Sequence, residues 1–91
     1  MENTKRKKSI IAMKKALTHL ENVIKMAEEN KYCIDIMQQN LAVIGLLKSA
    51  HQGFMENHLN TCFKNAMASK NEKLKQKMVD EILAVSKLVN K

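Results

Sequence analysis

The feature that most constrains the fold of this chain is the near absence of residues that interrupt a helix. The 91 residues include no proline and only two glycines, Gly45 and Gly53. Hydrophobic residues make up 45% of the chain and aromatic residues only 3%, so the apolar content is mainly aliphatic. A β-sandwich or barrel would need frequent turn residues and strands rich in aromatic or β-branched residues. The sequence therefore predicts an all-α protein.

Apolar residues in the first third of the chain recur at helical spacing. They form a heptad seam of the kind that packs one helix on another, made of Ile10, Met13, Leu17, Leu20, Ile24 and Ala27. A polar stretch follows this seam, and Asn30 within it can adopt the left-handed conformation that ends a helix. We expect residues 1–9 to form a basic N-terminal tail and residues 10–91 to form a single helical domain.

A second seam begins at Cys33 and continues without a helix breaker for more than thirty residues. Steps of four and three residues lead along it to His58, through Met37, Asn40, Ile44, Leu47, His51 and Phe54. A helix of roughly 34 residues spans about 50 Å, which is longer than a lone chain of this size needs. Other chains should therefore cover it. Glycine inside such a helix costs about 1 kcal/mol relative to alanine, and a close helix crossing would justify that cost.

A break is expected near residues 68–71, before a third amphipathic helix that runs to the C-terminus. Its apolar positions are Leu74, Met78, Ile82, Val85 and Val89. The expected protomer thus has three helices with a long central one.

The chain is strongly basic, with a formal net charge of +7. Such a charge favours a polyanionic partner, either nucleic acid or an anionic membrane surface, although solvated helix faces in lysine-rich proteins give the same value. No stretch approaches 18 apolar residues, and the chain begins without the apolar core of a signal peptide. We therefore expect a cytoplasmic protein with no membrane contact. In that reducing compartment, two cysteines are metal ligands, reactive thiols or core residues rather than a disulfide.

His58 and Cys62 could bind a metal ion together. They lie four residues apart on the predicted central helix, so their side chains project from one face. Cys33 lies 25 residues before His58, which separates the two by about 37 Å within one helix. If two copies of this helix run antiparallel about a two-fold axis near residues 45–47, Cys33 of one copy comes level with His58 and Cys62 of the other.

Two thiolates and one imidazole form a ligand set that suits Cu(I), a soft cation that tolerates low coordination. Zn(II) is also possible, although it would usually take a fourth ligand or water. Two neighbouring residues are candidates for supporting contacts. Tyr32 adjoins Cys33, and the Glu81 carboxylate could accept the second imidazole proton of His58.

The remaining residues form no pattern that is typical of an enzyme active site. No nucleophile with an adjacent base and no phosphate-binding loop is visible, and a short chain with few turn residues cannot easily form a catalytic cleft. The sequence predicts a protein that is not an enzyme and has no small-molecule substrate.

Three segments resemble the CsoR family of copper-sensing repressors: MAEENKYCIDI at residues 26–36, LAV at 41–43 and ENHLNTC at 56–62. Members of that family are three-helix protomers that form antiparallel dimers with a four-helix-bundle core and assemble as dimers of dimers. They bind operator DNA without metal and leave it when Cu(I) binds. The resemblance implies that Cys33 of one protomer, with His58 and Cys62 of its neighbour, holds copper.

Related sensors differ at these positions. Nickel sensors have histidine at the position of Cys62, persulfide sensors lack the middle histidine, and formaldehyde sensors use an N-terminal proline. The Cys, His, Cys set of this chain therefore favours copper within the family.

We expect a Cu(I)-responsive transcriptional repressor that acts as a homotetramer on operator DNA. Its phosphate contacts would come from six basic residues: Lys5, Arg6, Lys7, Lys8, Lys14 and Lys15. Arg6 is the only arginine in the chain, which favours an alternative, a Cu(I)-binding bundle that buffers copper without an operator. Another alternative is a thiol or persulfide sensor in which Cys33 and Cys62 of neighbouring chains form a crosslink.

Overall fold

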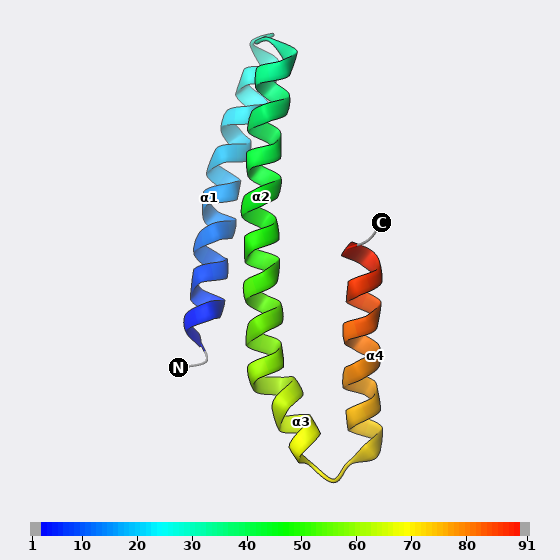
Figure 1. The fold of residues 1–91 in the computed structure, drawn as a ribbon. Coiled ribbons are helices and arrows are strands. Elements are labelled where there is room, and N and C mark those ends of the chain that lie inside the picture. The colour runs from blue at the N-terminus through cyan, green and yellow to red at the C-terminus, as the bar shows by residue number, and fades with distance from the viewer. Residues whose placement is uncertain (1–2, 90–91) are drawn as a thin grey trace. The chain divides into compact units, whose positions relative to one another are not determined.

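The computed structural model describes residues 3–89, which contain helices and no strand. The elements are α1 (Asn3–Glu28), α2 (Cys33–His58), η1 (Leu59–Phe63), α3 (Lys64–Ala68) and α4 (Glu72–Val89) (Figure 1). The second predicted helix corresponds to α2, η1 and α3, which follow one another without a non-helical residue. The all-α protomer with three helical segments and a long central one is confirmed. The chain divides into two compact units, up to Asn57 and from His58 onward, which are described separately below.

The first helix starts earlier than the sequence analysis placed it. α1 begins at Asn3, so residues 3–9 are not a tail but about two helical turns. The two residues before them lie outside the described part of the chain. The basic run at residues 5–8 is therefore displayed on a helix, which fixes the directions in which its charges point.

The end of α1 is closed by hydrogen bonds around Asn30, the residue expected to cap it. Asn30 has a φ of 58°, in the left-handed region. Its N–H donates to the Ala27 carbonyl at 3.2 Å, and the Lys31 N–H donates to the Met26 carbonyl at 3.0 Å. These two bonds are those of a Schellman motif, which satisfies carbonyls that the helix end would leave unpaired. The predicted helix end is confirmed.

α1 and α2 run antiparallel, side by side, as a helical hairpin (Figure 1). Its buried cluster consists of Ala16 and Val23 from α1 and Val43 from α2, with Ile36 and Leu46 packed against it. Ser9 and Ala50 are also buried. Because most of these side chains are small, the two helices can approach closely.

The heptad seam predicted for the first helix is not the one that this hairpin buries. Its large members stay exposed in the single chain: Ile10 37%, Met13 38%, Leu17 62%, Leu20 37% and Ile24 51%. The buried positions Ser9, Ala16 and Val23 form the adjacent stripe, also at heptad spacing. On α2, Met37, Ile44 and Leu47 are exposed in the same way. Each helix thus carries one stripe that faces its hairpin neighbour and one that the chain leaves uncovered.

The second unit joins the end of the central helical segment to α4. Ala66 is buried there, and the Ser69 hydroxyl donates to the Ala66 carbonyl at 2.7 Å. Asn71 caps α4, because its Oδ1 accepts the Leu74 N–H at 3.1 Å. The break predicted at residues 68–71 is confirmed. Along α4, Leu74, Met78, Ile82 and Val85 are half-buried, whereas Val89 is exposed.

A helix that crosses a membrane must be both long and apolar. Among residues 3–89, none of the helices combines the length and the apolar composition that a membrane span requires.

Candidate metal centre

Cys33 is the first residue of α2. Its thiol is free and exposed. The preceding Tyr32 is exposed as well, and its carbonyl accepts the Ile36 N–H at 3.2 Å, which fixes the backbone of the first turn around Cys33. A ligand arriving from solvent can therefore reach the Cys33 sulfur.

His58 and Cys62 lie where α2 changes into η1. His58 ends α2 and is half-buried, while Cys62 is exposed within the π-helical turn Leu59–Phe63. The Thr61 hydroxyl donates to the Cys62 sulfur at 3.7 Å. Single π-helical turns inside α-helices are frequent at functional sites. The two residues keep the helical spacing that the sequence predicted, one turn apart.

The three predicted ligands do not meet within one chain. Cys33 and His58 are the first and last residues of α2, so about 37 Å of helix separates them. Among the described residues, no group of three or more His, Cys, Asp or Glu side chains is close enough to hold a metal ion. A site made from these three residues would need a second chain.

Cys33 and His58 lie on the uncovered stripe of α2. Successive steps of four and three residues connect them through Met37, Asn40, Ile44, Leu47, His51 and Phe54, and a spacing of this kind follows one helix face. Met37, Ile44 and Leu47 on this stripe are exposed. The stripe that carries Cys33 at one end and His58 at the other is therefore exposed in its middle part, at Met37, Ile44 and Leu47. Near the His58 end, Phe54 is half-buried and contacts Arg6.

Comparison with known proteins decides the family. Residues 5–88 match the family described as "Metal-sensitive transcriptional repressor". The chain belongs to this family. It is a family of regulators rather than enzymes, as the sequence analysis expected.

Curated relatives of this chain carry more specific names. It is 38% identical over 63 residues to the copper-sensing transcriptional repressor CsoR of Mycobacterium ulcerans (strain Agy99), which covers 69% of this chain and 54% of that protein. The corresponding CsoR of Mycobacterium tuberculosis (strain ATCC 25618 / H37Rv) is 35% identical over 63 residues, covering 69% of this chain and 53% of that protein. The copper-sensing repressor RicR of the same strain is 31% identical over 70 residues, covering 77% and 73%.

The chain spans about half the length of the CsoR proteins that it matches. No solved structure matches it.

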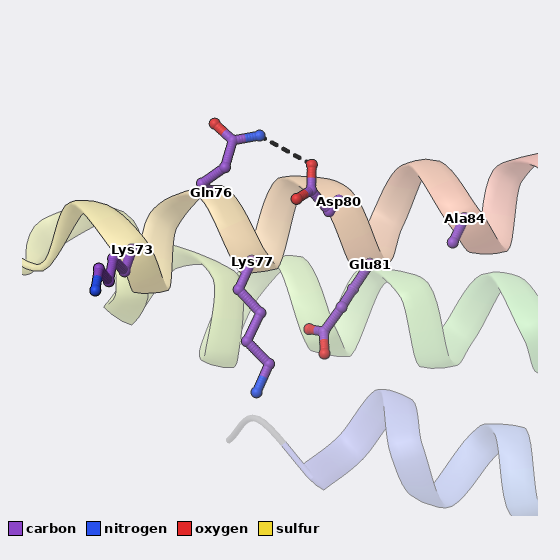
Figure 2. A pocket seen from close by; sticks show the side chains of 6 residues that line it. All are labelled: Lys73, Gln76, Lys77, Asp80, Glu81 and Ala84. Atoms are coloured by element: carbon purple, nitrogen blue, oxygen red, sulfur yellow. Dashed lines mark hydrogen bonds between the residues drawn. The ribbon is translucent and has the colours of Figure 1, made fainter.

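Glu81 lies on the polar face of α4. It lines a hollow with Lys73, Gln76, Lys77, Asp80 and Ala84. In Figure 2, Lys77 and Glu81 extend to one side of the helix, while Gln76 and Asp80 lie on the other side, joined by a hydrogen bond of 2.9 Å from Nε2 to Oδ1. Glu81 is thus exposed and accessible, and its hydrogen bond to His58 stays a prediction, as does a supporting role for Tyr32.

The six basic residues expected to contact DNA fall into two groups. Lys5 forms an ion pair with Glu56, and the Arg6 guanidinium lies 5.6 Å from the centre of the Phe54 ring, within range of a cation–π interaction. These two contacts attach the beginning of α1 to the end of α2. The remaining four are exposed on α1: Lys7, Lys8, Lys14 and Lys15.

The sequence analysis missed several residues near this end of the hairpin. Ser9, Ser49, Gln52 and Gly53 surround a cavity together with Lys5, Lys8 and Glu56. The one available signal was Gly53, because a glycine inside a helix indicated a close crossing. That crossing is confirmed, since a Cβ at position 53 would lie 2.0 Å from the Ser9 hydroxyl. Around Gly45, by contrast, a Cβ would meet no atom within 4 Å in the single chain.

Proposed function

We propose that this chain is a Cu(I)-responsive transcriptional repressor, which binds operator DNA without metal and releases it when Cu(I) binds between two protomers. One observation carries the proposal. Cys33 and His58 end the same helix and share its uncovered stripe, so an antiparallel second copy on that stripe is the arrangement that joins them at one ion.

The residue numbers of the stripe support this antiparallel register. The positions of the stripe form four pairs whose residue numbers add up to 91: 33 and 58, 37 and 54, 40 and 51, and 44 and 47. A two-fold axis between residues 45 and 46 therefore maps the whole stripe onto itself and covers its exposed apolar side chains. The same operation creates two equivalent metal sites per dimer.

The donor set and the relatives support copper. Two thiolates and one imidazole favour a soft ion of low coordination number, and the curated relatives are named as copper-sensing repressors. The set fits Cu(I) in a further respect, because both sulfur atoms are free and exposed in the single chain. A Zn(II) ion would need a fourth donor.

The exposed lysines of α1 support a DNA partner. Each phosphate that they neutralise releases counterions, so DNA affinity should fall steeply with salt. Copper that bridges two protomers changes the relative positions of helices that also carry these lysines. By linkage, the factor by which copper weakens DNA binding is the factor by which DNA weakens copper binding. A dimer of dimers would present the lysines of four α1 helices to one operator.

The test is fluorescence anisotropy of the reduced protein on labelled DNA from upstream of its own gene, with excess unrelated DNA, followed by titration with Cu(I). We expect specific binding that is lost at about one Cu(I) per protomer. In the Cys33→Ala variant, DNA binding should persist while copper no longer causes release. Ser86→Ala, which alters an exposed residue of α4, serves as the matched control. Release of Cys33→Ala by copper would contradict the assignment of the ligands.

A thiol or persulfide sensor is the second proposal, because both cysteines are free and exposed. In that case Cys33 and Cys62 of neighbouring chains would crosslink on oxidation, and His58 would be dispensable. Persulfide or peroxide treatment followed by non-reducing electrophoresis would show a covalent dimer in both the wild type and His58→Ala. Sequence-independent DNA binding combined with tight copper binding would instead indicate a copper buffer.

A further inference from the structure

The uncovered stripe of α2 is interrupted by two polar residues. Asn40 and His51 lie on it between Met37 and Phe54, and both are exposed in the single chain. A second copy that covers this stripe would remove both polar side chains from water. A buried amide or imidazole without a hydrogen-bond partner destabilises an interface. A stable dimer must therefore give each of them a partner.

The antiparallel register of the proposed function supplies that partner. With a two-fold axis between residues 45 and 46, position 40 of one copy lies level with position 51 of the other, because the two numbers add up to 91. An asparagine amide can donate and accept hydrogen bonds, and a neutral imidazole offers one donor and one acceptor. Asn40 of one copy can thus pair with His51 of the other, and the axis repeats the pair.

The other positions of the stripe also meet residues of their own kind in this register. Met37 lies level with Phe54, and Ile44 lies level with Leu47, so apolar side chains oppose apolar ones. The two ends of α2, which carry predicted metal ligands, meet as well. Facing positions at this spacing form the layers of a packed helix pair. Each layer is therefore chemically matched.

Registers that differ by one heptad lose this matching. Sliding one copy by seven residues places Asn40 opposite Ile44 in one direction and His51 opposite Leu47 in the other. Each slip therefore buries a polar side chain against an aliphatic one. The same slip separates the two ends of the ligand set by about 10 Å along the helices, which is too far for a shared metal ion.

We propose that Asn40 and His51 form a hydrogen-bonded pair between protomers, which fixes the register of the copper site and selects a second copy of this chain as its partner. The inference rests on the proposed function and names the partner that completes its site. A buried polar residue in a helix interface can specify register and partner at a cost in stability. A related chain with aliphatic residues at both positions would leave the pair unmatched and would be rejected.

The experiment replaces the members of the pair by leucine in the full, reduced chain. The variants are Asn40→Leu, His51→Leu and the double variant. Gln38→Leu is the matched control, because Gln38 is an exposed residue of α2 outside the stripe. All three positions are exposed in the single chain, so circular dichroism should show wild-type helix content in every variant.

Sedimentation equilibrium measures how each variant associates with itself. Each single variant leaves two polar side chains opposite leucine in its dimer and should associate at least about tenfold more weakly than the wild type. The double variant should associate at least as tightly as the wild type, because apolar contacts replace both polar pairs. Gln38→Leu should associate as the wild type does.

Mixtures of two chains separate a specific pair from a general effect on stability. Asn40→Leu and His51→Leu, one of them isotopically labelled, are mixed in equal amounts. Dimers are then fixed with a short bifunctional thiol reagent and counted by mass spectrometry. Heterodimers should exceed about nine-tenths of all dimers, because they alone place no polar residue opposite leucine.

The reverse mixture contains the wild type and the double variant. Its heterodimers place every Asn40 and His51 opposite leucine, so they should fall below about one-tenth of all dimers. Substitutions that act independently add in free energy, which would leave heterodimers at the random value of one half in both mixtures.

The outcomes distinguish this inference from the proposed function. Heterodimers at one half in both mixtures would overturn the polar pair, and release of operator DNA by copper in the wild type would leave the repressor function intact. Heterodimers enriched in the first mixture and depleted in the second, without release of operator DNA by copper, would support the pair and reject the repressor.

Discussion

The two ends of the α1–α2 hairpin differ in chemistry. At the closed end, next to Asn30, the contact is apolar, with Val23, Val43 and Ile36 in one cluster and a Schellman motif at the turn. At the open end, the contact consists of Ser9 against Gly53 and of the ion pair between Lys5 and Glu56. The closed end and the middle of the hairpin are therefore joined by apolar contacts, and polar and charged contacts are concentrated at the open end.

This division has a consequence for the proposed dimer. In the antiparallel register, the closed end of one hairpin lies level with the open end of the other. The predicted metal ligands divide in the same way, because Cys33 begins α2 at the closed end and His58 ends it at the open end. Copper would thus connect the apolar end of one protomer to the polar end of its neighbour.

Breaking the apolar cluster should have the largest effect. Val43→Asp places a carboxylate at a residue that is 4% exposed, without a cation to pair with it, and should lower the free energy of unfolding by about 3 kcal/mol or more. Urea denaturation followed by circular dichroism measures this loss. The control Val89→Asp, at an exposed residue near the end of α4, should change it by no more than about 0.5 kcal/mol. Equal losses in the two variants would contradict the location of the core.

The uncovered stripe should matter for association rather than for folding of the chain. Leu47→Glu introduces a charge next to the predicted two-fold axis and should weaken self-association by about 100-fold, since a buried unpaired charge opposes the interface. Sedimentation equilibrium measures this change. Leu88→Glu, also at an exposed leucine, is the matched control and should associate as wild type. An unchanged dimer in Leu47→Glu would reject the antiparallel register.

The smallest expected effect concerns the cap of the closed end. Asn30→Ala should destabilise the chain by about 1 kcal/mol, because alanine disfavours the left-handed φ of 58°, whereas Asn30→Gly should be neutral or slightly stabilising. Thermal denaturation compares them. Asn22→Ala, on the exposed side of α1, should instead stabilise by a few tenths of a kcal/mol. The same sign for both alanine variants would show that Asn30 does not act through its backbone conformation.

The helix ends could be predicted because they depend on neighbouring residues alone. Asn30 and Asn71 each act within a few residues of the end that they cap. The predicted start of α1 was wrong, because the basic residues before Ser9 show no apolar periodicity. These residues are nevertheless part of the helix. The π-helical turn at Leu59–Phe63 has no distinctive residue and was not foreseen.

The stripe of α1 that packs in the hairpin could not be predicted, for a physical reason. Two adjacent stripes fit the heptad spacing, and the hairpin uses the one with the smaller side chains, Ser9, Ala16 and Val23. For the site, residue spacing alone predicted His58 with Cys62. The cavity could not be predicted from the sequence, since it depends on contact between Ser9 and Gly53, which lie 44 residues apart.

If a second copy covers the uncovered stripes of α1 and α2, as proposed, the lifetime of the chain depends on its own abundance. A protein whose large apolar side chains are covered only by another copy gains stability by mass action, as it would from any ligand that binds the folded state. Newly made chains at low concentration open more often, and proteases act on the open form. The amount of folded chain should therefore fall faster than its rate of synthesis, which would set a threshold below which the proposed operator is left empty.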